Sequence, residues 1–138
     1  MEKSEKLERT FDKFEKVFRK FEEIVKAPQL FDFLNEELVI EVATKRFEYT
    51  FEALWNVLRE YLRREGILCS TPMQTFKEAF KRGLVSEENE ELLFEIVDKR
   101  NKIVHIYGID EARQIYNFIK QDRVYEAFKD IYDSLKKT

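Results

Sequence analysis

Cysteine, histidine, glycine and proline are all scarce in this chain of 138 residues, and each scarcity excludes a class of protein. The single cysteine, Cys69, cannot form an internal disulfide. With only one histidine, the chain also lacks the Cys and His ligands of a zinc site, although its carboxylates could still bind Mg²⁺. Three glycines and two prolines favour long helices over many short strands. We therefore expect no disulfide, no Cys/His metal site and no cofactor.

Long apolar runs are absent as well. No segment approaches the roughly 18 apolar residues of a membrane span. The N-terminal residues MEKSEKLERT are charged from the second position and lack the apolar centre of a signal peptide. We therefore expect a cytoplasmic protein with no membrane partner. The net charge of −3 argues against a protein that coats nucleic acid through bulk electrostatics, and leaves only a local basic site.

Aromatic residues are abundant, with 13 Phe and 6 Tyr to fill a core. The length fits one domain over residues 1–138. In residues 4–26, apolar residues recur three and four positions apart, which predicts a helix that ends before Pro28. Its stripe fits a core helix, or else a seam between two chains. The stripe consists of Leu7, Phe11, Phe14, Phe18, Phe21 and Val25.

Four further helices are predicted at about 36–65, 71–82, 86–107 and 110–136. On the longest, 36–65, we expect Glu48, Tyr49 and Glu52 to be solvated or at a rim. The predicted helix starts are Thr71 with its capping-box partner Gln74, Ser86, and Asp110, and the predicted ends are Gly66, Gly83 and Gly108. Together these elements predict an all-α, up-and-down bundle of about five helices.

The segment DKRNKIVHIYG, residues 98–108, carries the only histidine and places polar groups where the helical period predicts apolar ones. At about 100° per residue, Arg100 points along the apolar stripe that contains Ile96 and Val97. An Arg in that direction must extend its charge to solvent, find an anionic partner or line a pocket.

The neighbouring face of that helix carries Asp98, Asn101 and His105. Asn101 and His105 lie one turn apart, so their side chains can touch. The helix C-terminus favours a protonated imidazole, and unwinding there would bring His105 towards Arg100. A single His at a helix end is usually a packing residue, but the combination also fits a site that handles phosphate.

The residues RNKIVHIYG resemble the R-N-x-x-x-H-x-Y form of the HEPN motif. The preceding segments KRFEYTFEALWNVLREYLRREGI and TPMQTFKEAFKRGLV resemble the nucleotidyltransferase substrate-binding proteins, a branch of the HEPN superfamily that includes HepT-type toxins. The likeness covers nearly the whole chain and keeps the order of elements.

This resemblance implies a helical bundle that forms a homodimer and a partner that is a minimal nucleotidyltransferase encoded nearby. It implies catalytic or nucleotide-contacting roles for Arg100 and His105, with Asn101 as the polar residue after the Arg. Tyr107 matches the tyrosine that the partner enzyme modifies with AMP in HepT-like members. Gly108 departs from the acidic or amide residue often found next. RNA or a nucleotide is the expected ligand.

Three functions fit the sequence. The first is a HepT-like toxin, a metal-independent endoribonuclease, whose Arg/His site lies at a dimer interface because one His cannot serve as both base and acid. In this function Asp98 and Asn101 would support the site. The second is a non-catalytic subunit that binds nucleotide or substrate for a two-component nucleotidyltransferase. The third is a purely structural helical adaptor.

Overall fold

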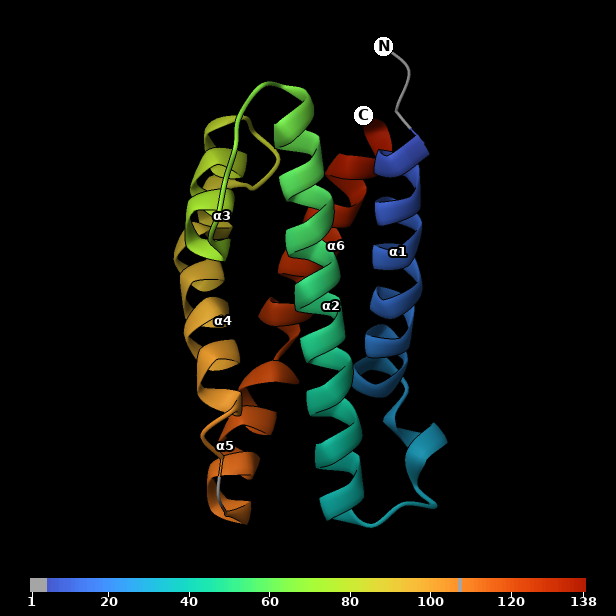
Figure 1. Cartoon of the computed structure of the whole chain (residues 1–138). Helices are drawn as coiled ribbons and strands as arrows, with labels where there is room; N and C mark the ends of the chain where they lie inside the picture. The colour runs from blue at the N-terminus through green and yellow to red at the C-terminus, as the bar shows by residue number, and fades with distance from the viewer. Residues whose placement is uncertain (1–4, 107) are drawn as a thin grey trace.

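Two long antiparallel helices, α1 (Glu5–Lys26) and α2 (Glu36–Arg64), form the frame of the molecule (Figure 1). A short 3₁₀ turn, η1 (Pro28–Phe31), connects them. The computed structural model describes residues 5–106 and 108–138. Asn35 begins α2 by accepting a hydrogen bond from the backbone N–H of Leu38 over 2.8 Å.

The remaining helices pack around α2, as Figure 1 shows, with α1 on one side, α3, α4 and α5 on the other, and α6 behind. Their bounds are α3 (Pro72–Lys81), α4 (Glu90–Ile103), α5 (Ile109–Ile119) and α6 (Asp122–Lys137), with a 3₁₀ turn, η2 (Glu87–Asn89), before α4. The described residues contain no strand, which agrees with the predicted all-α bundle. None of the helices they form is long and apolar enough to cross a membrane.

The last predicted helix, 110–136, is in fact two helices, so the described chain has six α-helices instead of about five. The break falls at Gln121, whose extended backbone (φ −65°, ψ 141°) separates α5 from α6. In one continuous helix, Val124 would lie about 180° from Ile115 and about 140° from Ile119. All three are buried, and the break is what allows both apolar faces to reach the core.

The predicted helix ends are only partly right. Gly66 and Gly83 have φ of +84° and +76°, the left-handed conformation that glycine tolerates after a helix. Gly108 does not close α4: its backbone is extended (φ −147°, ψ 164°) and it precedes α5, because α4 has already ended at Ile103.

The predicted helix starts are also only partly right. The Thr71 hydroxyl accepts from the Gln74 N–H over 3.2 Å as expected. The Gln74 carboxamide, however, accepts from the N–H of Ser70 instead of Thr71, over 3.1 Å. Ser86 begins the η2 turn and makes no side-chain cap, so α4 starts only at Glu90. Asp110 is already inside the first turn of α5, which Gly108 precedes, and therefore is not its cap.

Aromatic side chains from α1, α2 and α6 fill the centre of the bundle. Phe21 of α1, Phe47 of α2 and Phe128 of α6 are fully buried and meet with ring centroids 5.8 to 6.2 Å apart. Edge-on and tilted contacts of this kind add about 0.5–1.5 kcal/mol each beyond the burial of apolar surface. The burial of the α1 stripe within one chain means that it is a core helix and not a seam between chains.

Candidate functional site

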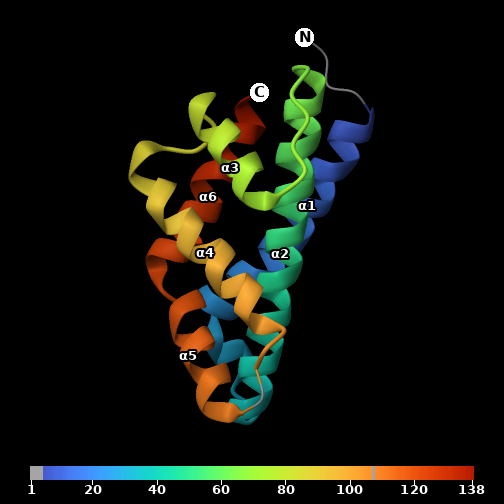
Figure 2. The same ribbon diagram turned by 60° about the vertical axis from the view of Figure 1, so that its left-hand side comes forward.

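Arg100 lies near the C-terminal end of α4 and points to α2, where its guanidinium forms an ion pair with the Glu52 carboxylate. Figure 2 shows the end of α4 that approaches α2. The guanidinium carbon lies 5.1 Å from the centroid of the Phe51 ring, within reach of a cation–π attraction. The Arg100 side chain is 29% exposed. Of the alternatives open from sequence, the anionic partner is therefore the one realised, at the protein surface.

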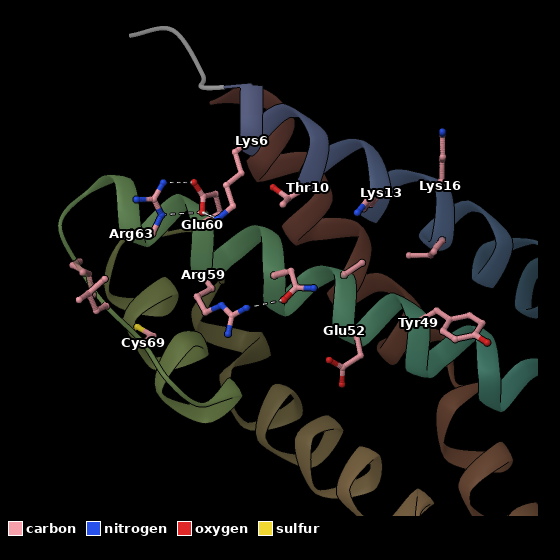
Figure 3. A pocket seen from close by; sticks show the side chains of 15 residues that line it. Lys6, Thr10, Lys13, Lys16, Tyr49, Glu52, Arg59, Glu60, Arg63 and Cys69 are labelled. Carbon is pink, nitrogen blue, oxygen red and sulfur yellow. Dashed lines mark hydrogen bonds and ion pairs between the residues drawn. The ribbon is translucent and has the colours of Figure 1, made fainter.

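Glu52 is a site residue that the sequence analysis did not select. The sequence predicted only that it is solvated or at a rim, and its carboxylate points away from α1 (Figure 3). The side chain is 42% exposed, so water screens its pairing with Arg100. The sequence places Glu52 directly after Phe51, which lies on the apolar face of α2, but this position alone does not identify it as the partner of Arg100.

Asn101 and Asp98 take different positions. The Asn101 carboxamide oxygen accepts a hydrogen bond from the Arg100 guanidinium over 3.2 Å, so Asn101 belongs to the same cluster. Asp98 instead pairs with Lys102, with Oδ2 and Nζ 3.1 Å apart, on the exposed face of α4. The structure thus brings Arg100, Asn101 and Glu52 together and leaves Asp98 outside that cluster.

His105 lies beyond the end of α4 and not on its last turn. Its backbone N–H donates to the Lys102 carbonyl over 3.0 Å in a turn, and its side chain is exposed. No hydrogen bond joins its ring to Arg100 or Asn101 within the part of the chain that the structure describes. The contact expected from one helical turn between Asn101 and His105 is therefore not made. Tyr107, the expected site of AMP addition, lies outside the described residues.

The turn that carries His105 also exposes apolar surface. Val104 is 73% exposed, and Ile109 at the start of α5 is 42% exposed. Between this turn and α2 lies a hollow of about 510 Å³ lined by Ile103, Ile106 and the acidic side chains of α2. A partly exposed Arg100 and an exposed His105 thus flank an apolar edge.

The described residues offer no resident metal site: no group of three or more His, Cys, Asp or Glu side chains is placed to hold an ion. What they do offer is a cation for a phosphate, in Arg100, and an accessible imidazole for proton transfer, in His105.

Comparison with known proteins assigns the family. Residues 9–137 match the family described as nucleotidyltransferase substrate binding protein like. A solved protein of Thermus thermophilus is 30% identical, and the match covers 89% of this chain and 98% of that one, with a TM-score of 0.74. No curated protein matches the chain.

A second solved structure is the tri-AMPylated HEPN toxin of Shewanella oneidensis in complex with its MNT antitoxin. The likeness covers 99% of this chain and all of the toxin, with a TM-score of 0.72, at 13% sequence identity. At that identity it is a likeness of fold, and it agrees with the HEPN-type bundle. The chain belongs to the nucleotidyltransferase substrate binding protein-like family and has the helical fold of the HEPN superfamily.

Proposed function

We propose that this chain is the HEPN partner subunit of a minimal nucleotidyltransferase and acts as a HepT-like, metal-independent endoribonuclease. The observation that carries the proposal is the surface cluster around Arg100, followed five residues later by the exposed His105. The family assignment supports the choice of partner. The similar Shewanella toxin is bound to an MNT antitoxin, which supports a toxin and antitoxin pairing here as well.

The chemistry needs an anion-binding group and two proton-transfer groups. His105 takes the proton from a ribose 2′-hydroxyl, and the 2′-oxygen attacks the adjacent phosphorus. The bond from phosphorus to the 5′-oxygen breaks, and that oxygen receives a proton from the His105 of a second subunit. Arg100 stabilises the negative charge on the non-bridging oxygens of the five-coordinate phosphorus. The products are a 2′,3′-cyclic phosphate and a free 5′-hydroxyl.

A homodimer follows from this scheme, because each chain has one His. The exposed Val104 and Ile109 beside the site support a symmetric contact through this edge. Pairing two such edges would bury apolar side chains next to both imidazoles. It would also bring two Arg100 guanidinium groups to one cleft.

RNA cleavage by the purified protein tests the proposal. We expect wild type to cut single-stranded RNA in EDTA and to leave cyclic phosphate ends, whereas His105→Ala and Arg100→Ala lose at least about 100-fold in kcat/KM. Lys102→Ala, which removes a neighbouring charge outside the cluster, serves as the matched control. An inactive wild type, or equal activity in all four proteins, would contradict the nuclease.

A non-catalytic subunit that binds nucleotide or substrate for the transferase is the second candidate. Two observations favour it: Glu52 already pairs with the charge of Arg100, and among the described residues no hydrogen bond joins His105 to Arg100. Nucleotide binding that needs Arg100, without RNA cleavage, would identify this function. If the chain were a purely structural adaptor, neither His105→Ala nor Arg100→Ala would change its function.

A further inference from the structure

A groove with a volume of about 760 Å³ runs between α1 and α2 (Figure 3). The start of the α2–α3 connection closes one end, at Ile67, Leu68 and Cys69. The other end reaches Tyr49 and Glu52 on α2. Glu52 also pairs with Arg100, so the candidate site described above adjoins the groove at this residue.

Basic side chains dominate this groove although the whole chain has a net charge of −3. Its lining contains two carboxylates, Glu52 and Glu60, against five cations. Such a local excess attracts an anionic ligand even when the protein as a whole is acidic. The five cations are Lys6, Lys13, Lys16, Arg59 and Arg63.

Two of the cations, Lys6 and Arg63, pair with a carboxylate of the groove lining. The Glu60 carboxylate is 5% exposed and accepts hydrogen bonds from Arg63 over 2.7 and 3.0 Å. The Lys6 ammonium of α1 lies 3.5 Å from the same carboxylate. Hydrogen bonds from Arg63 lower the pKa of Glu60, which keeps it ionised. Lys6 and Arg63 thus share the single negative charge of Glu60.

The other three cations have no carboxylate partner within the described chain. Lys13 points towards α2, and the Lys16 ammonium points outward at the rim (Figure 3). Arg59 donates to the Asn56 side chain over 3.1 Å and lies over the Trp55 ring, so its charge is not neutralised. This uncompensated charge is what a bound anion would meet.

Tyr49 adds an aromatic surface at the end nearest Arg100. Its side chain is 57% exposed, far more than the other aromatic residues of α2 that fill the core. An exposed ring beside a row of cations is the arrangement with which proteins bind single-stranded nucleic acid, since bases stack on the ring and phosphates meet the cations.

We infer that this groove binds a single-stranded RNA and leads it to Arg100. The inference rests on the proposed function and assigns the substrate track for it. Lys13, Lys16 and Arg59 contact phosphates, and Tyr49 stacks on a base next to the Glu52–Arg100 pair. From Lys6 to Lys16 the α1 axis advances about 15 Å, which matches roughly four nucleotides of a stacked strand. An acidic protein segment would meet the cations equally well, but it would not account for a groove that adjoins the Arg100 site and carries an exposed aromatic ring.

Fluorescence anisotropy with a labelled single-stranded RNA tests the inference, in a His105→Ala background that prevents cleavage. We expect the Lys13→Ala/Lys16→Ala double variant to bind roughly tenfold more weakly at low salt. The slope of log K against log salt should fall by about 1.4, because each lost phosphate contact contributes about 0.7 for a single strand. Tyr49→Ala should also weaken binding, while Tyr49→Phe keeps it.

The control is Lys81→Ala/Lys120→Ala, which removes the same charge from exposed positions outside the groove. An equal loss in both double variants, or no RNA binding by the His105→Ala protein, would overturn the groove assignment. An RNA affinity that does not depend on Lys13 and Lys16 would exclude RNA as the occupant of the groove. An acidic protein segment would then remain as the alternative occupant.

Cleavage measured in parallel separates this inference from the proposed function. If wild type cleaves RNA and Lys13→Ala/Lys16→Ala leaves KM unchanged, RNA does not bind in the groove, and the proposed nuclease activity is retained. If wild type binds RNA through these lysines but does not cleave it, the nuclease is wrong and the groove stands. We expect the double variant to raise KM with little change in kcat, because these lysines lie away from the reacting phosphate.

Discussion

Arg100 of α4 and Glu52 of α2 stand 48 residues apart in the sequence and form an ion pair at the protein surface. The pair joins α4, which carries Arg100 and Asn101, to α2, the longest helix of the bundle. It also means that a phosphate arriving at Arg100 competes with a carboxylate for the same guanidinium.

Glu52→Gln should therefore strengthen RNA binding. A partly exposed ion pair of this type contributes about 0.2–1 kcal/mol, so removing the competing charge should tighten binding by a factor between about 1.4 and about 5. Anisotropy in the His105→Ala background measures the effect. Glu48→Gln is the matched control, because Glu48 pairs with Lys45 one turn away on α2. Weaker binding by Glu52→Gln would mean that Glu52 helps to hold the ligand instead.

Val104→Asp should convert the proposed dimer into monomers and abolish RNA cleavage together, since it places a charge in the apolar edge beside His105. The free energy of unfolding of the monomer should change by less than about 0.5 kcal/mol, because Val104 is exposed. Light scattering measures the mass of the particle in solution and so separates dimer from monomer. Leu30→Asp is the control, because Leu30 is an exposed apolar residue of η1. A wild-type monomer that still cleaves RNA would refute the shared site.

Phe128→Ala should destabilise the protein by about 3–5 kcal/mol, because it opens a cavity among the rings of Phe21 and Phe47. Phe33→Ala removes the same side chain where it is 80% exposed and should cost less than about 0.5 kcal/mol. Urea unfolding followed by circular dichroism compares the two. Equal losses would contradict the assignment of the core.

Protonation of Glu60 should lower the free energy of unfolding in acid. Hydrogen bonds from Arg63 hold the pKa of Glu60 below its ordinary value of 4.5. Its contribution to the free energy of unfolding is therefore full above pH 4.5 and is lost as the pH falls through the lowered folded-state pKa. Urea midpoints between pH 7 and pH 2.5 should fall less steeply for Glu60→Gln than for wild type. Glu41→Gln, at an exposed position, should keep the wild-type dependence of the urea midpoint on pH. The same dependence in Glu60→Gln as in wild type would contradict the role of Glu60.

Tyr107 should accept AMP from the partner nucleotidyltransferase. The added phosphate would bring negative charge close in sequence to Arg100 and silence cleavage by charge and volume. Intact mass after incubation with the partner and ATP should rise by whole AMP groups in wild type and not in Tyr107→Phe. An unchanged wild-type mass, or equal addition to both proteins, would rule the modification out.

The fold was largely predictable because helical periodicity reports burial directly. The α1 stripe, the long α2 and the left-handed turns at Gly66 and Gly83 all follow from local spacing and backbone sterics. The division of the last helix was missed although the sequence contained a sign of it. The apolar stripe through Ile115 and Ile119 moves to the opposite side at Val124, without a glycine or proline to mark the change.

The site was less predictable because it depends on contacts between distant elements. The pattern placed Arg100 among apolar neighbours and required a partner for it, but nothing local identified Glu52 on another helix. The assumption that α4 continues to Gly108 also set His105 one turn below Asn101, whereas α4 ends at Ile103. The basic groove escaped notice because its cations come from two helices, so no run of charge in the sequence reveals it.

The early end of α4 separates the part of the chain that carries the proposed chemistry from the part that supplies stability. The aromatic centre joins α1, α2 and α6, while Val104 and His105 project from a turn outside it. Substitutions of Val104 and His105 should therefore change the free energy of unfolding little. If the proposed chemistry resides there, single replacements at these two positions can alter or remove it while the bundle keeps its fold.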